Sequence, residues 1–127
     1  MIKSYTDLEQ SKKLAEILPI ESADMCWCNN SIKGVNYTNE FANLYTVKET
    51  KELFDTALNG WDKYWELIPC WSLAALLEII RNNGRYELQM YEGGYYFEAN
   101  GFMTESYFNP VDACYEMILK LHELKML

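Results

Sequence analysis

The chain contains one histidine, His122, and this limits the acid–base chemistry available to it. A serine or cysteine nucleophile needs a base within hydrogen-bond reach, held in turn by a third group. His122 falls in the last turns of an expected helix, where partial positive charge is favourable. No serine or cysteine motif accompanies it. The sequence therefore predicts a solvated helix residue, and no catalytic triad or multi-histidine metal site.

Four cysteines offer thiol chemistry, at positions Cys26, Cys28, Cys70 and Cys114, and only the first two are close in sequence. Residues two apart on a strand share a face but rarely form a disulfide with each other. A zinc site would need two further ligands at characteristic spacing. Without a glycine-rich phosphate loop, we expect no catalytic residues, no cofactor and no metal. The thiols are predicted to be reduced and mostly buried.

Carboxylates are the plentiful reactive group, with 19 acidic residues against 11 basic ones and a formal net charge of −8. This excess of negative charge disfavours binding to nucleic acid and to anionic membrane surfaces, because proteins bind both through Lys and Arg. A glycosidase-type pair would need two carboxyl groups in different environments. We expect the glutamates of residues 85–108 to line a solvated sheet face, so enzymatic activity is not favoured.

Residues 85–92 alternate as a half-buried strand does, and Gly93-Gly94 is typical of a two-residue hairpin turn. A turn at these glycines places Met90 opposite Phe97 on the core face and Tyr91 opposite Tyr96 on the other face. The second face is a possible protein partner surface, since aromatic residues anchor interfaces. Its members are Glu87, Gln89, Tyr91, Tyr96 and Glu98. The alternative is that the first helix or residues 61–68 cover it.

Several elements must position this hairpin. Thr6-x-x-Glu9 predicts a capped helix to about Leu18, ended by Pro19. Further expected elements are a strand over 24–28, a turn over 29–34, a strand over 35–38, a helix from Thr46 to 58, an extended segment over 61–68, a helix capped by Ser72 and stopped at 82–84, a strand over 102–108 and a last helix opened by Asn109-Pro110. Residues 39–46 are ambiguous.

Together these elements predict a single α+β domain over residues 1–127. An antiparallel sheet, formed by the meander 85–108 and a shorter N-terminal hairpin, packs against three to four helices. The first ten residues contain no apolar run of signal-peptide type, and no stretch is long enough to cross a membrane. We therefore expect a cytoplasmic protein. Its oligomeric state is not determined by the sequence.

Four spaced blocks carry a resemblance: residues 23–27, 68–77, 86–88 and 109–117, which read ADMCW, IPCWSLAALL, YEL and NPVDACYEM. In this order they resemble a family of small proteins of unknown function from gut anaerobes and their phages and mobile elements. The resemblance implies a cytoplasmic setting and a phage or mobile-element origin. It implies no activity, cofactor or catalytic residue.

The predicted function is a non-enzymatic, acidic protein-binding or accessory protein of phage or mobile-element type. One version is an acidic mimic of nucleic acid, which requires Glu87, Glu98 and Glu105 on one face. A second class is a small-molecule binder or enzyme with an aromatic cleft near Trp27, Trp65 and Trp71. A third is a self-associating structural protein.

Overall fold

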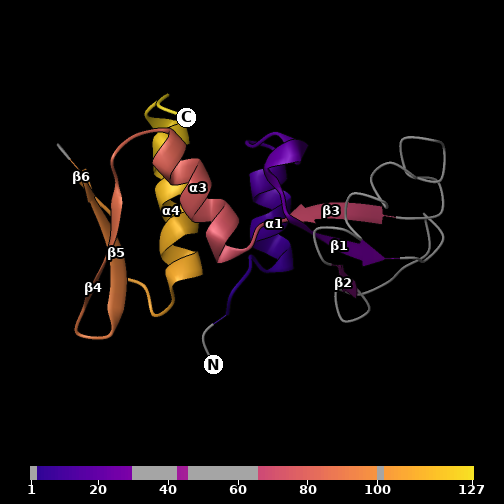
Figure 1. Ribbon diagram of the computed structural model, residues 1–127, viewed down its shortest axis with the longest axis horizontal. Helices are drawn as coiled ribbons and strands as arrows, with labels where there is room; N and C mark the ends of the chain where they lie inside the picture. The colour runs from indigo at the N-terminus through magenta and orange to yellow at the C-terminus, as the bar shows by residue number, and fades with distance from the viewer. Residues whose placement is uncertain (1–2, 30–42, 46–65, 100–101) are drawn as a thin grey trace. The chain divides into compact units, whose positions relative to one another are not determined.

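The computed structural model describes residues 3–29, 43–45, 66–99 and 102–127. The chain divides into two compact units, one formed by Asp7–Trp71 and the other by Met1–Thr6 with Ser72–Leu127. Each unit contains a three-stranded antiparallel sheet and α-helix (Figure 1), which confirms the predicted α+β class. The strands form two separate antiparallel sheets instead of the one expected from the sequence. One domain over 1–127 stays a prediction.

In the first unit, α1 (Leu8–Ala15) is capped at its N-terminus by Asp7. The Asp7 carboxylate accepts a hydrogen bond from the Gln10 amide at 2.8 Å, and the Asp7 amide donates to Gln10 Oε1 at 3.2 Å. The capping box is therefore one residue later than predicted from Thr6. Thr6 is fully buried and belongs to the other unit, whereas a carboxylate at Asp7 also complements the helix dipole. The helix ends at Ala15, earlier than expected.

The sheet of this unit has β1 (Met25–Asn29) between β2 (Asn43–Tyr45) and β3 (Glu66–Cys70), and α1 packs beside β3. A short 3-10 helix, Ile20–Ser22, precedes β1. The strand predicted over 24–28 is confirmed as β1. Residues 66–68 of the expected extended segment lie in β3, hydrogen-bonded within the sheet instead of lying over the core. The predictions for residues 30–42, 46–58 and 61–65 lie outside the described residues.

The second unit contains α3 (Leu73–Asn82) and α4 (Pro110–Glu123), and both predicted caps are confirmed. Ser72 Oγ accepts from the Ala75 amide at 3.2 Å, and Asn109 Oδ1 accepts from the Asp112 amide at 2.9 Å. Helical spacing in the sequence puts an apolar stripe along α4, formed by Ala113, Cys114, Met117, Ile118, Leu121 and Leu124. This α4 stripe is fully buried except for its last member, Leu124. With α3 and β5 it forms the core of the unit, which comprises Leu76, Ile80, Phe97, Val111, Ala113, Cys114, Met117, Ile118 and Leu121.

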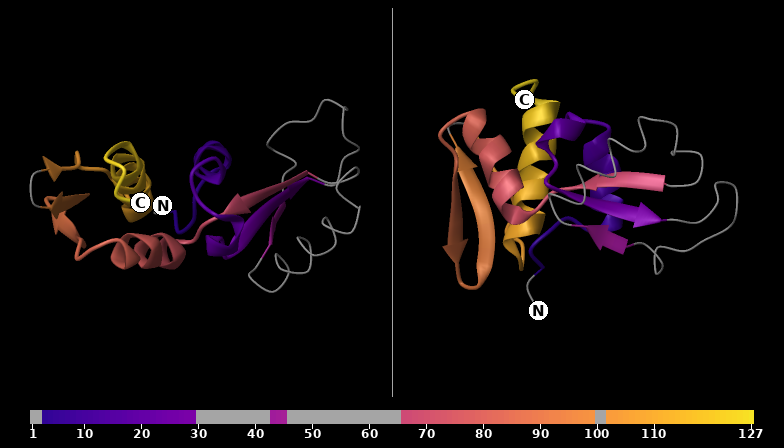
Figure 2. Two further views of the ribbon diagram at one scale, coloured as in Figure 1. Left: turned by 90° about the horizontal axis from the view of Figure 1, so that it is seen from above. Right: turned by 45° about the vertical axis from the view of Figure 1, so that its right-hand side comes forward.

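The sheet of the second unit has the order β4 (Glu87–Tyr91), β5 (Gly94–Ala99), β6 (Phe102–Met103). Strand β6 is shorter than the segment predicted over 102–108, although Tyr107 makes an isolated bridge to Tyr95. Both helices lie on the same side of this sheet (Figure 2), and α4 packs against β5. One face of the sheet is therefore covered within the unit.

The hairpin between β4 and β5 turns one residue earlier than predicted. Glu92 and Gly93 occupy the turn, with φ of 50° and 79°, as a type I′ turn requires at both central positions. Tyr91 therefore pairs with Gly94 and Met90 with Tyr95. The predicted pairs Tyr91–Tyr96 and Met90–Phe97 are wrong by two residues. A shift of two leaves every side chain on its predicted face, since the side-chain period of a strand is two.

Gly94 explains why the turn does not use both glycines. A Cβ built on Gly94 would collide with Ser106 Oγ and lie 3.2 Å from Ser106 Cβ. Gly94 is the first residue of β5, beside the segment in which Tyr107 exchanges two backbone hydrogen bonds with Tyr95. The glycine is required for this close approach of the chain, while Glu92 accepts a positive φ in the turn.

Gly94→Ala is expected to lower the free energy of unfolding by about 1 kcal/mol, because overpacking outweighs the reduced chain entropy of alanine. Chemical denaturation followed by circular dichroism measures this change. Ser106→Ala removes the colliding oxygen, so the double variant Gly94→Ala, Ser106→Ala should regain most of the loss. Purely additive effects of the two substitutions would contradict the proposed role of Gly94.

Candidate partner surface

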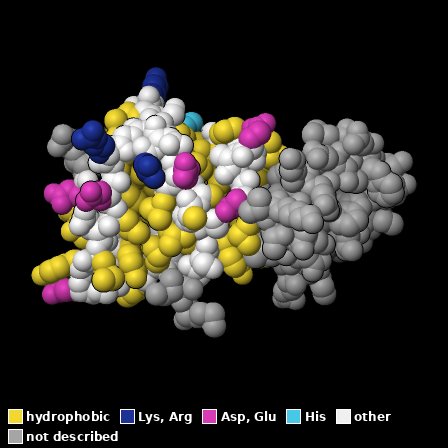
Figure 3. Space-filling model, viewed as in Figure 1, with side chains coloured by type: hydrophobic (Ala, Val, Ile, Leu, Met, Phe, Trp, Pro, Cys, Tyr) yellow, Lys and Arg dark blue, Asp and Glu magenta, His cyan; other side chains and the backbone are white. Residues whose placement is uncertain are grey.

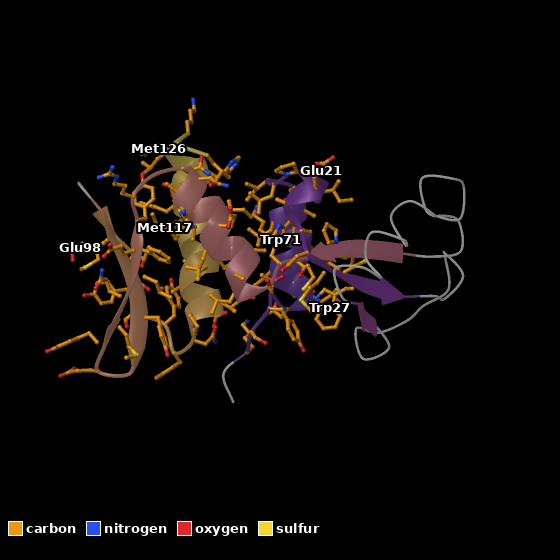
Figure 4. The ribbon with its side chains drawn as sticks, viewed as in Figure 1. Glu21, Trp27, Trp71, Glu98, Met117 and Met126 are labelled. Atoms are coloured by element: carbon orange, nitrogen blue, oxygen red, sulfur yellow. The ribbon has the colours of Figure 1, made fainter. Side chains whose placement is uncertain are left out.

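The five residues singled out from the sequence lie on one face of the β4–β5 hairpin. We call this the outer face, and it comprises Glu87, Gln89, Tyr91, Tyr96 and Glu98. The register pairs Glu87 with Glu98 and Gln89 with Tyr96. Figure 4 shows Glu98 on the side of the sheet away from Met117 of α4. The opposite face carries Phe97, which is fully buried.

The two tyrosines of the outer face are diagonal neighbours instead of direct partners. Tyr91 lies opposite Gly94, and Tyr96 lies opposite Gln89. Diagonal positions are about 7–8 Å apart, which aromatic side chains can span. Because its partner is a glycine, Tyr91 has no side chain directly across from it, and 69% of its surface is exposed. Tyr96 is half-buried.

Glu87 and Glu98 lie directly opposite each other, and both are exposed. Like charges in this position destabilise a strand pair by up to about 1 kcal/mol. No described salt bridge involves either carboxylate. The pair therefore weakens the hairpin and leaves a concentrated negative charge next to Tyr96, on the face that also carries Tyr91.

Three exposed apolar residues adjoin this part of the unit and were missed or misjudged from the sequence: Met90, Met103 and Phe108. They are 68%, 64% and 92% exposed. Met90 was expected in the core, but the corrected register moves it beside Tyr95 near the turn. Met103 pairs with Glu98 and so lies on the outer face. Figure 3 shows hydrophobic and acidic side chains side by side at the left margin, over this sheet.

A second acidic group surrounds Tyr107. Burial raises the pKa of the Glu116 carboxyl, and the charges of Glu105 and Asp112 raise it further. Burial also raises the pKa of Tyr107. The negative charges of Glu116, Glu105 and Asp112 raise it further, by smaller amounts. Asp112 forms a salt bridge to Lys3 at 2.8 Å. Glu105 thus acts electrostatically with the α4 carboxylates, so the described structure gives no support to a nucleic-acid mimic that needs it beside Glu87 and Glu98.

This environment predicts a pH dependence of stability. The pKa of Glu116 is higher in the folded than in the unfolded chain. Its contribution to the free energy of unfolding is therefore fully present below the unfolded-state pKa of about 4.3. That contribution is lost as the pH rises through the folded-state pKa. Glu116→Gln should therefore raise the free energy of unfolding at pH 7 and change it little near pH 4. Urea unfolding at the two pH values measures the difference. An equal gain at the two pH values would contradict a raised pKa of Glu116.

Three of the four thiols lie in the core. Cys26, Cys70 and Cys114 are fully buried, and burial raises the pKa of Cys114 to about 12. A thiol with so high a pKa is a poor nucleophile at neutral pH. Among the described residues, no group of three or more His, Cys, Asp or Glu is placed to hold a metal ion. His122 is exposed, as predicted.

The tryptophans expected to line a cleft are placed differently from one another. Trp71 is fully buried, and its Nε1 donates a hydrogen bond to Ser22 Oγ at 2.9 Å. Trp27 is half-buried in β1, and Trp65 lies outside the described residues. Trp71 is therefore a core residue whose indole N–H has a hydrogen-bond acceptor, and this gives no support to a ligand cleft at its side chain.

No family model, curated protein or solved structure matches this chain. The resemblance to small proteins of gut anaerobes and their mobile elements therefore stays a prediction. None of the helices that the structure describes is long and apolar enough to span a membrane.

Proposed function

We propose that the protein is a non-enzymatic binding protein that contacts another protein through the outer face of its β4–β5 hairpin. The observation that carries this proposal is the 69% exposure of Tyr91 on the same face as the opposed carboxylates of Glu87 and Glu98. Tyrosine supplies a large contact area at low entropic cost, and exposed aromatic anchors are typical of interfaces.

The negative charge of the protein and of its outer face indicates the kind of partner that would bind. The chain carries a formal net charge of −8, and the outer face contains two glutamates and no basic residue. A basic protein surface would relieve the repulsion between Glu87 and Glu98 and would be attracted at long range. An accessory role in a phage or mobile element, in the cytoplasm, is part of this proposal and derives from the sequence resemblance.

Affinity capture from host lysate tests the proposal with the wild type beside a Tyr91→Ala, Tyr96→Ala double variant. We expect a basic protein to be captured by the wild type and to be lost with the double variant. Binding should also weaken as salt increases, because exposed charges are screened. Ile20→Ala changes an exposed apolar residue of the other unit and should retain the partner. Equal capture by wild type and double variant would exclude the outer face.

A further inference from the structure

Strand β4 forms one edge of its sheet in the part of the chain that the structure describes. On β5, the Tyr95 amide donates to the Tyr107 carbonyl at 2.7 Å, and the Thr104 amide donates to the Phe97 carbonyl at 2.9 Å. Tyr95 and Phe97 therefore direct their backbone groups toward β6. Their partners on β4, Met90 and Leu88, must direct theirs the opposite way, out of the sheet.

This edge lacks the features that usually protect a terminal strand. Proteins prevent unwanted pairing with lysine, proline, bulges or inward-pointing charge. Strand β4 has the sequence Glu-Leu-Gln-Met-Tyr and contains no lysine, proline or bulge. Its one charge, Glu87, lies on the outer face. Met90 and Tyr91 are both more than two-thirds exposed, at 68% and 69%, so the edge offers apolar surface as well as backbone groups.

We propose that an extended basic segment of a partner protein adds to the β4 edge as a further strand, an inference that rests on the protein-binding function proposed above. Addition of a strand satisfies the outward N–H and C=O groups of Leu88 and Met90. It also covers the exposed side chain of Met90. The main-chain bonds supply affinity, and alternate side chains of the added strand supply specificity.

The two faces of the sheet define the sequence of this segment. Side chains of the added strand on the outer face lie beside Glu87 and Tyr91, where arginine or lysine pairs with the carboxylate and packs on the ring. Side chains on the other face lie beside Leu88 and Met90, where apolar residues fit. The segment is thus an alternation of basic and apolar residues. A second copy of β4 fits less well, because it brings another Glu87 and no basic side chain.

Synthetic peptides test the proposal on the full chain. The probe is an acetylated hexapeptide in which arginine and valine alternate, and its control has glutamate in place of arginine. We expect the arginine peptide to bind, with the backbone amide NMR signals of Leu88 and Met90 shifting most. The glutamate peptide should not bind. Absence of binding by the arginine peptide, or equal binding of both peptides, would overturn the proposal.

N-methylation of the probe distinguishes strand addition from simple charge attraction. Only alternate amides of an added strand face β4. Methylation of either the arginine or the valine amides should therefore weaken binding at least about tenfold, while methylation of the other set should have a smaller effect, reflecting loss of backbone hydrogen bonds. Equal binding of the two methylated peptides would contradict strand addition without requiring any variant of the protein.

Met90→Pro provides the matching change in the protein. Proline removes the outward amide but no hydrogen bond to β5, and it is tolerated at strand edges. Met90→Thr also shortens the side chain but keeps the amide. We expect the proline variant to bind the arginine peptide about tenfold more weakly than the threonine variant. Equal affinities of the two variants would overturn the proposal.

The outcomes separate this inference from the function on which it depends. If Met90→Pro leaves peptide binding unchanged and Tyr91→Ala, Tyr96→Ala abolishes it, the outer face binds protein but the edge accepts no strand. If edge pairing persists in the double tyrosine variant, the edge is used and the outer face is not. A wild-type dimer in sedimentation that Met90→Pro dissociates would identify a second copy as the occupant and overturn the basic partner.

Discussion

Replacing Phe97 with alanine is expected to lower the free energy of unfolding by about 3–5 kcal/mol. Phe97 lies in β5, is fully buried and is on the face against which α4 packs. Alanine would leave a cavity between the sheet and α4 that the surrounding side chains only partly fill. Since a domain is stabilised by about 5–15 kcal/mol in total, the loss is a large fraction of the stability of this unit.

The distribution of tryptophan makes this experiment informative about domain organisation. All four tryptophans, Trp27, Trp61, Trp65 and Trp71, belong to the unit formed by Asp7–Trp71. Tryptophan fluorescence therefore reports the unfolding of that unit, whereas far-UV circular dichroism reports the unfolding of both units. If residues 1–127 form one cooperative domain, Phe97→Ala should shift both transitions together. A shift of the dichroism transition alone would show that the two units unfold separately.

Met90→Ala is the matched control for Phe97→Ala. Both residues are large and apolar and lie on the same face of the hairpin, but Met90 is 68% exposed. Its truncation should change the free energy of unfolding by less than about 0.5 kcal/mol. Similar losses in the two variants would contradict the burial of Phe97 and the register of the hairpin.

The local signals in the sequence predicted the elements of the second unit well. Ser72 and Asn109 cap helices because their side chains satisfy amides only three residues away, and the α4 stripe follows from helical periodicity alone. At the start of α1 the same reasoning selected the wrong residue. Thr6 and Asp7 are adjacent potential caps, and the burial of Thr6, which decides between them, is a tertiary effect.

The hairpin register depended on a contact that local reasoning does not include. Gly93-Gly94 favours a turn at both glycines when only the turn is considered. Ser106, twelve residues further along the chain, requires Gly94 in the strand. The pairing of β1 with β3 is likewise non-local, because Trp27 and Ile68 are neighbours in the sheet but far apart in sequence. An apolar run indicates burial and does not identify its partner.

The residues of the outer face were predicted correctly although the register was not, because the register differs by two residues, which is an even number. Glu87, Gln89, Tyr91, Tyr96 and Glu98 kept their face although their partners changed. Exposure was not predictable in the same way. Met90 lies on the predicted core face yet near the turn, beyond the part of the sheet where Phe97 is buried. Alternation gives the face of a residue, whereas the extent of the covering helix decides its burial.

Replacing Trp71 with alanine should likewise lower the free energy of unfolding by about 3–5 kcal/mol. Trp71 is fully buried and follows β3 directly, and its Nε1 donates to Ser22 Oγ at 2.9 Å. Ser22 Oγ in turn donates to the Pro19 carbonyl at 2.6 Å. The indole therefore connects the end of β3 to the 3-10 helix before β1, so its removal costs packing and also leaves Ser22 without this donor. Urea unfolding followed by circular dichroism measures the loss.

Ser22→Ala separates the hydrogen bond from the packing of the ring. It leaves the buried indole N–H without the Ser22 acceptor, which should cost about 1–3 kcal/mol. Trp71→Phe removes the donor and retains much of the apolar volume. In a Trp71→Phe background, Ser22→Ala should therefore cost less than it does alone, since the donor that needed Ser22 is gone. Equal costs in the two backgrounds would show that the bond contributes nothing and that Trp71 stabilises the unit by packing alone.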